Sequence, residues 1–233
     1  MKQPLTTETT NAMQPTNNTT GIKLIIFDFD GTLGDSRKLI TDTMLLTLRQ
    51  MGLEERTREE CARTIGLPLE KCFSTLMPMS NEQARQCAEV YGGIFHEKNV
   101  PGAVKPFPGV VETVRLLQRK GMEMAIASSR RHRSLQQFVM DMKLEDCFSC
   151  LIGADDVTRA KPDAEPVTTL LAHFGRSANE TLVVGDTDYD ILMGRNAGVR
   201  TCGVTYGNGT ATELTEAGAD FLIHSMSELL LHV

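Results

Sequence analysis

The spacing of hydrophobic residues changes along the chain. A continuous apolar run at residues 24–27 is typical of a strand buried on both faces of a parallel sheet. From residue 101 onward, short apolar runs alternate with segments whose apolar residues recur every three or four positions. This alternation predicts strands near residues 22–29, 122–127, 148–152, 181–184, 200–204 and 220–223, with helices between them and a helix at the C-terminus. We therefore expect an α/β fold with a doubly wound, mostly parallel sheet.

Between the first two strands the spacing is helical throughout. Capping boxes that begin at Thr57 and Ser80 mark two helix starts in this region. Helices are predicted over about 37–51, 57–66, 68–76 and 81–98. Four helices are too many for one crossover between parallel strands, so residues 36–102 are predicted to form an inserted helical cap domain, hinged near residues 34–36 and 102–106. Residues 21–35 and 103–233 would then form the core domain, and the polar residues 1–20 a disordered tail.

Charge and cysteine content narrow the possible partners. The net charge of −6 argues against nonspecific binding to nucleic acid and against attraction to a membrane surface, because both favour a basic protein. No apolar run approaches the roughly 20 residues that span a bilayer, and residues 1–20 lack the hydrophobic stretch of a signal peptide. Six cysteines without such a signal favour reduced thiols, and the pair Cys147 and Cys150 lacks a second pair for zinc. We expect a cytoplasmic protein, as a monomer or weak homodimer.

Polar residues stand where three predicted strands end, which is where open α/β sheets bind ligands. Asp28 and Asp30 follow the first strand, and strand alternation would place both carboxylates on one side. Ser128 and Ser129 follow strand 122–127, and three aspartates occur within residues 185–190. Close carboxylates repel one another unless a cation or a shared proton compensates them. The simplest interpretation is a Mg²⁺ site in which one carboxylate is free to attack.

Taken one at a time, these signals also have ordinary structural explanations. A Ser-Ser turn often caps a helix, a lone lysine such as Lys161 is usually a solvated surface charge, and residues 185–190 could form an exposed acidic loop. The run Arg130–Arg133 places cations at a helix N-terminus, against the helix dipole. It could attract an anionic substrate, but an exposed basic turn is the simplest interpretation.

The string FDFDGTLGDS at residues 27–36 resembles the first motif of the haloacid dehalogenase-like hydrolases. Ser128, Lys161 before Pro162, and the segment 185–198 match the remaining three motifs in the correct order. The resemblance covers about residues 22–224. It implies a phosphatase that forms a phosphoaspartyl intermediate.

The resemblance also implies a role for each matching residue. Asp28 would be the nucleophile and Asp30 the general acid/base, while Ser128 and the catalytic Lys161 would hold the phosphoryl group. Asp186 would complete the Mg²⁺ site with the Asp28 carboxylate and the Asp30 backbone carbonyl. Asp190 would support this site, and Thr32 and Ser129 are the further candidate substrate-binding residues.

Two of these positions also bear on the choice within the family. Thr32 favours a phosphatase because related mutases tend to have Val there. Ser129 stands where many family phosphatases have Asn, which leaves the orientation of the substrate open.

A helical cap between the first two motifs resembles the phosphoglycolate phosphatase and β-phosphoglucomutase branch of the family. The segments IGLPL at 65–69 and GVTYG at 203–207 favour its phosphoglycolate phosphatase-like members. The implied substrate is a small phosphorylated metabolite: a phosphoglycolate-like compound, a sugar phosphate or pyrophosphate. A sugar phosphomutase is the alternative within the fold. A phospho-receiver signalling module is the alternative from another class, although its acceptor aspartate does not stand in a DxD string on the first strand.

Overall fold

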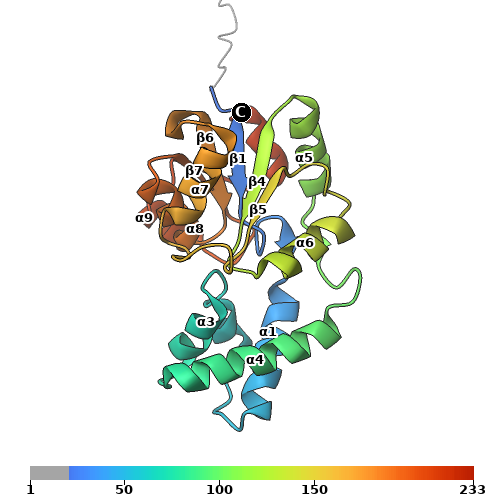
Figure 1. Cartoon of the computed structure of the whole chain (residues 1–233), viewed down its shortest axis with the longest axis vertical. Coiled ribbons are helices and arrows are strands. Elements are labelled where there is room, and N and C mark those ends of the chain that lie inside the picture. The colour runs from blue at the N-terminus through green and yellow to red at the C-terminus, as the bar shows by residue number, and fades with distance from the viewer. Residues whose placement is uncertain (1–20) are drawn as a thin grey trace, which may run out of the picture.

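The computed structural model describes residues 21–233, and the predicted disordered tail, residues 1–20, lies outside the described residues. A six-stranded sheet forms the centre of the molecule, in the order β5-β4-β1-β6-β7-β8, and all its neighbouring strands are parallel (Figure 1). Its strands are β1 (Leu24–Phe27), β4 (Glu123–Ala127), β5 (Cys150–Ile152), β6 (Thr181–Gly185), β7 (Arg200–Val204) and β8 (Phe221–Ile223). The predicted doubly wound α/β fold is confirmed.

Helices cover both faces of this sheet, and a further group lies beyond the carboxyl ends of its strands (Figure 1). The first set consists of α5 (Val110–Arg119), α6 (His132–Asp141), α7 (Glu165–Phe174), α8 (Asp188–Asn196), α9 (Ala211–Glu216) and the 3-10 helices η1 (Ala178–Glu180) and η2 (Met226–Leu231). The second group consists of α1 (Arg37–Gln50), α2 (Arg58–Ala62), α3 (Leu69–Leu76) and α4 (Asn81–Lys98), which pack on one another.

The side chains of strand β1 are buried on both faces of the sheet. Leu24 and Ile26 belong to an apolar cluster with residues of α7 and α8, whereas Ile25 and Phe27 belong to a second cluster with residues of α5, α6 and η2. All four side chains are fully buried. Because successive side chains of a strand point to opposite faces, an unbroken apolar run is what a two-sided core requires.

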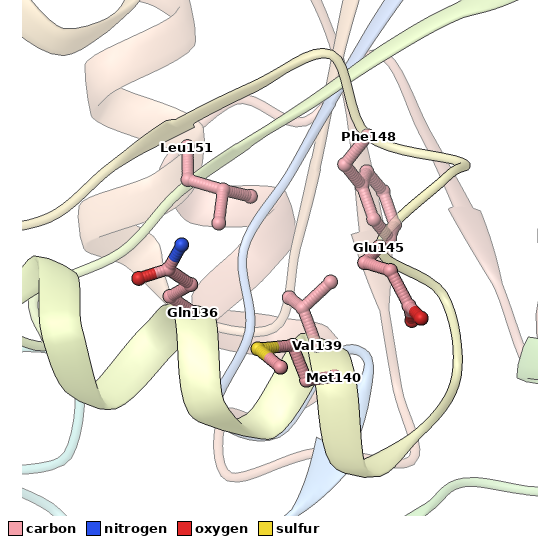
Figure 2. A pocket seen from close by; sticks show the side chains of 6 residues that line it. All are labelled: Gln136, Val139, Met140, Glu145, Phe148 and Leu151. Carbon is pink, nitrogen blue, oxygen red and sulfur yellow. The ribbon is translucent and has the colours of Figure 1, made fainter.

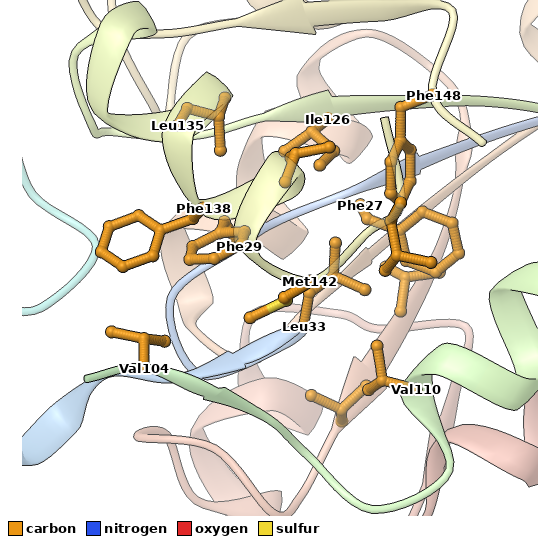
Figure 3. Packing of buried hydrophobic residues seen from close by; sticks show 14 of the residues in the cluster. Phe27, Phe29, Leu33, Val104, Val110, Ile126, Leu135, Phe138, Met142 and Phe148 are labelled. Carbon is orange, nitrogen blue, oxygen red and sulfur yellow. The ribbon is translucent and has the colours of Figure 1, made fainter. Parts of the chain in front are cut away.

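The second cluster continues from the sheet into helix α4. Figure 3 shows Phe29 and Phe138 side by side beneath the sheet, with ring centroids 5.3 Å apart. Phe95 of α4 meets Phe138 edge-on at 6.3 Å and stacks on Tyr91 at 5.6 Å. Aromatic pairs at these separations add specific geometry to apolar burial. A chain of rings therefore joins the sheet to helix α4.

Most predicted elements are present, with three differences. The two predicted hinges, near 34–36 and 102–106, pair as a short antiparallel ribbon of β2 (Gly34–Asp35) and β3 (Lys105–Pro106), which the hydrophobic pattern did not reveal. The C-terminal helix is a 3-10 helix, η2. Helix α2 ends at Ala62, short of the predicted stop near residue 66, because the chain continues in turns. The capping boxes at Thr57 and Ser80 form as predicted.

Two broader expectations concern thiols and membranes. All six cysteines are free; Cys147 is buried and Cys150 is half-buried on β5. Within residues 21–233, no helix has both the length and the apolar character needed to cross a membrane.

Candidate active site

Three buried carboxylates meet at the carboxyl ends of β1 and β6. Asp28 directly follows β1, and its backbone N–H donates to the Val184 carbonyl of β6 over 2.8 Å. Asp186 directly follows β6, and Asp190 lies in the first turn of α8. One carboxylate oxygen from each of the three aspartates lies within 4.8 Å of the others. The segment 185–190 is therefore a buried acidic site and not an exposed loop.

Lys161 lies between two of these carboxylates. Its Nζ is 2.6 Å from Asp28 Oδ1 and 2.6 Å from Asp190 Oδ1. The residue is 4% exposed, so the usual interpretation of a lone lysine as a solvated charge is wrong here. Burial alone would lower the pKa of Lys161, but Asp190 and Asp28 together raise it above its usual value. The two carboxylates therefore favour the charged form of Lys161.

The positive charge of Lys161 does not fully compensate the buried carboxylates. Burial, with the neighbouring carboxylates Asp190, Asp186 and Asp30, raises the pKa of Asp28 well above its usual value, against the opposing effect of Lys161. Burial and the charge of Asp190 raise the pKa of Asp186 to about 7. A pKa raised in this way means that the folded protein disfavours the charged form of the group. Another cation would relieve this cost.

The loop after β7 holds Asp186 and the Asp30 backbone in place. The Asn208 backbone N–H donates to Asp186 Oδ2 over 2.7 Å, and its side-chain amide donates to the same atom over 3.0 Å. That amide also lies 3.4 Å from the Asp30 carbonyl oxygen. Thr32 Oγ1 donates to Asp186 Oδ1 over 3.1 Å. The predicted role of Thr32 in substrate binding stays a prediction.

The three predicted metal ligands are oxygen atoms of the kind that bind a magnesium ion. Mg²⁺ prefers oxygen ligands and is often bound by one or two carboxylates together with phosphate oxygens. Asn208 contacts two of the three predicted ligands, the Asp186 carboxylate and the Asp30 carbonyl, so these two oxygens lie beside each other. The third predicted ligand, Asp28, belongs to the same buried acidic group as Asp186. This acidic group could hold a metal ion.

The Asp30 carboxylate points to a different set of partners. Strand β1 ends at Phe27, so the alternation that would align Asp28 with Asp30 does not extend that far. The Asp30 carboxylate accepts hydrogen bonds from the Ser36 hydroxyl and from Arg130 Nη2, the latter over 2.7 Å. The group of three close carboxylates does not include it. The expectation that the Asp28 and Asp30 side chains converge is therefore wrong for this structure.

The two serines after β4 also separate. Ser128 is 6% exposed, and its hydroxyl accepts the Arg130 backbone N–H over 3.2 Å. Since β4 pairs with β1, Ser128 stands beside the strand that carries Asp28. Ser129 instead donates to the Gly66 carbonyl over 2.5 Å, in the loop between α2 and α3. The predicted substrate residues thus include one at the sheet and one that contacts a loop between helices α1–α4 of the predicted cap (the cap helices).

The basic turn is not uniformly exposed. Arg131 and Arg133 are exposed, as the sequence indicates, but the Arg130 side chain is 9% exposed. Its guanidinium carbon lies 4.6 Å, 5.0 Å and 5.8 Å from the ring centroids of Phe138, Phe95 and Phe29. For Arg130, the interpretation as an exposed turn is wrong.

Two residues of this site were not among the predicted site residues. Arg130 was noted only as part of a basic turn, although it follows directly on the serine motif. Asn208 follows the GVTYG segment, but nothing in the sequence indicates that it reaches back to Asp186.

A cavity elsewhere on the molecule contains none of the predicted site residues. It has a volume of about 250 Å³ and lies between α6, the chain that follows it and β5 (Figure 2). Its lining residues are Gln136, Val139, Met140, Glu145, Phe148 and Leu151. We assign it no part in the site.

The fold and the buried acidic group define a class of doubly wound α/β protein with an acidic site at the carboxyl end of its first strand. The family model of the haloacid dehalogenase-like hydrolases matches residues 25–204. The chain belongs to this family. The predicted family and enzyme class, a phosphatase of the haloacid dehalogenase-like hydrolases, are confirmed.

Curated relatives and solved structures similar to this chain carry phosphatase or haloacid dehalogenase-like hydrolase names. A protein named "Pyrophosphatase PpaX" from Anoxybacillus flavithermus is 34% identical over 209 residues, covering 90% of this chain and 95% of the relative. A protein named "Probable phosphatase IndB" from Dickeya dadantii is 34% identical over 212 residues, covering 89% and 91%. A haloacid dehalogenase-like hydrolase structure from Bacteroides fragilis, 29% identical, superposes with a TM-score of 0.85 and covers 89% of this chain and 99% of that chain.

Proposed function

We propose that this protein is a Mg²⁺-dependent phosphatase that hydrolyses a small phosphate compound through a phosphoaspartyl intermediate on Asp28. The observation that carries the proposal is the buried group of Asp28, Asp186, Asp190 and Lys161 at the ends of β1 and β6. Magnesium, when bound by Asp28, Asp186 and the Asp30 carbonyl, would neutralise charge on the phosphoryl group.

Asp28 is prepared to act as the nucleophile. Its Oδ1 accepts from Lys161, while the described residues give no hydrogen-bond donor to its Oδ2. Lys161 holds Asp28 in place through one oxygen and leaves the other available for attack on phosphorus. Covalent attack divides one difficult displacement into two easier steps. Lys161 and Ser128 would hold the phosphoryl oxygens, whose charge must be balanced in the transition state.

Asp30 would supply the proton. As the Asp28–phosphorus bond forms and the bond to the leaving oxygen breaks, Asp30 would protonate that oxygen. It would then accept a proton from the water that hydrolyses the phosphoaspartate. Both steps require the Asp30 carboxyl to turn from its present partners towards the phosphoryl group.

Residues 36–102 would act as a cap domain over this site, hinged at the β2–β3 ribbon. The contacts that support this role are the Ser129–Gly66 hydrogen bond and the aromatic contact between Phe138 and Phe95. The cap would shield the phosphoaspartate from bulk water and select the leaving group, since the core residues touch only phosphate and metal.

The substrate class is taken from the site and the relatives together. Relatives named pyrophosphatase, and fold neighbours that include a predicted phosphoglycolate phosphatase from Haemophilus somnus, point to small phosphate compounds. The free cysteines support a reducing compartment such as the cytoplasm. We propose a monomer or weak homodimer that needs no macromolecular partner for its chemistry.

The test is phosphate release from a panel of phosphomonoesters and pyrophosphate, with Mg²⁺ and with excess EDTA. We expect release that depends on Mg²⁺ and stops in EDTA. Full activity in EDTA would overturn the proposal. Conversion of a sugar phosphate to its isomer without net phosphate release would identify the phosphomutase alternative. Stable self-phosphorylation without turnover would identify a receiver module.

A further inference from the structure

The side-chain amide of Asn208 lies beside two of the oxygens that are predicted to bind Mg²⁺. Its nitrogen, Nδ2, donates to Asp186 Oδ2 over 3.0 Å and lies 3.4 Å from the Asp30 carbonyl oxygen. An amide NH₂ group offers two N–H donors, whose positive ends attract oxygens as a cation does. The Asn208 NH₂ group therefore contacts the same pair of oxygens that a bound cation would contact.

The other polar atom of this amide has no partner. Asn208 Oδ1 is buried and lacks a hydrogen bond in the part of the chain that the structure describes. Most buried side-chain polar atoms are hydrogen-bonded, and an exception calls for an explanation such as an ion. The last side-chain torsion of asparagine is broad and roughly two-fold, so half a turn exchanges the places of oxygen and nitrogen. That half turn would bring Oδ1 to the Asp186 carboxylate and the Asp30 carbonyl.

The surrounding backbone keeps this amide close to Asp186. A Cβ at Gly31 would collide with Asp186 Oδ2 and with Asn208 Nδ2, and one at Gly207 would also collide with Asp186. The chain can pass this near to the two side chains because glycine has no Cβ. The Asn208 backbone N–H donates to Asp186 Oδ2 over 2.7 Å, and the Gly209 N–H donates to the Asp186 carbonyl over 3.1 Å. The loop is therefore anchored without the Asn208 side chain.

We propose that Asn208 is a further ligand of the Mg²⁺ ion. Its amide turns when the ion binds and gives Oδ1 to the ion beside the Asp186 carboxylate and the Asp30 carbonyl. Octahedral Mg²⁺ holds its ligands at about 2.1 Å, which places adjacent ligand oxygens about 3 Å apart. The Asn208 amide nitrogen is already 3.0 Å from Asp186 Oδ2. The inference rests on the proposed function, which places Mg²⁺ at this site.

An asparagine suits this position better than another carboxylate would. Asp28, Asp186 and Asp190 already bring three carboxylates together, and a fourth would add to their repulsion. The amide carries a donor and an acceptor on one rotatable group. It can therefore donate to Asp186 through NH₂ before the ion binds and supply an oxygen to the ion afterwards.

The test measures Mg²⁺ binding to the full-length protein by isothermal titration calorimetry, after treatment with EDTA and dialysis. Asn208→Ala removes the amide and keeps both backbone hydrogen bonds of the loop. We expect it to raise the Kd for Mg²⁺ about 10–100-fold, the usual cost of losing a group that supports a metal site. Asn208→Asp keeps an oxygen and loses the donor, so it should bind Mg²⁺ at least as tightly as wild type. Weak binding by both variants would overturn the inference, because the NH₂ donor would then be the group that matters.

A crystal structure of the wild-type protein with Mg²⁺ tests the ligand directly. We expect Asn208 Oδ1 to lie about 2.1 Å from the ion. A contact this short identifies the oxygen, because the amide NH₂ group offers donors only. An Asn208 side chain that still donates to Asp186, with the ion held by the other residues alone, would overturn the inference.

Asn179→Ala is the matched control, because Asn179 is an exposed asparagine just before β6, at the end of that strand opposite to the site. It should leave the Kd for Mg²⁺ within about twofold. Thermal unfolding in EDTA would establish that each variant folds. If Asn208→Ala does not fold, Asn208→Asp and the crystal structure carry the test.

The outcomes separate this inference from the proposed function. If the wild-type protein neither binds Mg²⁺ nor releases phosphate in its presence, the proposed function fails. If the wild-type protein binds Mg²⁺ and Asn208→Ala binds it equally well, only the inference fails.

Discussion

Ion pairs at the end of the sheet are buried, whereas those on the cap helices are exposed to solvent. At the end of β1, Lys161 and Asp28 form an ion pair at 2.6 Å with side chains only 2% and 8% exposed. On helix α1, Asp42 pairs with Arg58 at 2.5 Å, but these side chains are 28% and 43% exposed. Burial makes a pair costly to form and costly to break, whereas a solvated pair contributes little. A buried charge cluster is therefore a sign of function in this molecule, and charges on the cap surface are not.

The junction between the two regions combines both kinds of contact. The stacked rings of Phe29 and Phe138 continue to Phe95 of α4, and Arg130 lies against all three. Gly66 has a positive φ of 105°, and a Cβ there would lie 3.2 Å from Thr187 Oγ1. The loop between α2 and α3 therefore passes close to the residue that follows Asp186. If residues 36–102 act as the proposed cap, this junction is where we expect the substrate to be selected.

The largest expected effect is the loss of activity when Asp28, at the end of the sheet, is replaced. Asp28→Asn should lower kcat by more than about 10⁴-fold, because an amide cannot form the acyl phosphate. Without metal, the same change should raise the free energy of unfolding, since it removes a charge from a cluster that disfavours it. Phosphate release and thermal unfolding in EDTA measure the two effects. Turnover like that of wild type would place the nucleophile elsewhere.

Loss of a cation should affect stability far more in the sheet than in the cap. Lys161→Met leaves Asp28 and Asp190 without their shared partner, and we expect it to lower the free energy of unfolding by about 3–5 kcal/mol. Arg58→Met, on the cap surface, should lower it by less than about 1 kcal/mol. Urea unfolding of both variants in EDTA provides the measurement. Equal losses would mean that burial does not distinguish the two pairs.

The pH dependence of stability should reveal the charge deficit of the site. Below about pH 4, Asp186 is protonated in both the folded and the unfolded protein. Between that value and its folded pKa of about 7, the folded protein retains a proton that the unfolded chain has released. The free energy of unfolding in EDTA should therefore fall as pH rises through this window, by up to about 4 kcal/mol.

Saturating Mg²⁺ should remove most of this fall by supplying the missing positive charge. Urea unfolding at several pH values, with EDTA and with Mg²⁺, would measure it. The variant Asp186→Asn should show a smaller fall in EDTA than wild type. A stability profile that rises across this window in EDTA would contradict the description of the site as short of positive charge.

The smallest expected effect concerns the polar contact between the two regions. Ser129→Ala removes the hydrogen bond to the Gly66 carbonyl, which is worth about 1 kcal/mol. We expect kcat/KM to fall about fivefold, by unequal factors for substrates with different leaving groups, with little change in melting temperature. Thr75→Ala, at an exposed position on α3, is the control and should change nothing. Equal factors for all substrates would argue that this contact has no part in selectivity.

Much of the fold was predictable because it depends on local signals. The apolar run at 24–27 is typical of a strand covered on both faces, and the capping boxes at Thr57 and Ser80 fix helix starts through contacts three residues apart. The positions of Asp28, Ser128, Lys161 and Asp186 at strand ends or in the loops that follow them come from the same periodicity. Parallel strands bring their carboxyl ends to one edge of a sheet, so the convergence of these residues follows from the order of elements.

Tertiary structure decided which partner each polar group found. Asp30 is bound by Arg130, one hundred positions away, and not by its neighbour in the DxD string. Asn208 reaches Asp186 and the Asp30 carbonyl from a loop after β7. Periodicity places a side chain on a face or at a strand end, but a hydrogen bond is set by loop paths and packing between distant segments. The sequence alone therefore determined where the candidate site lies, and the folded chain decided that a buried arginine holds the Asp30 carboxylate.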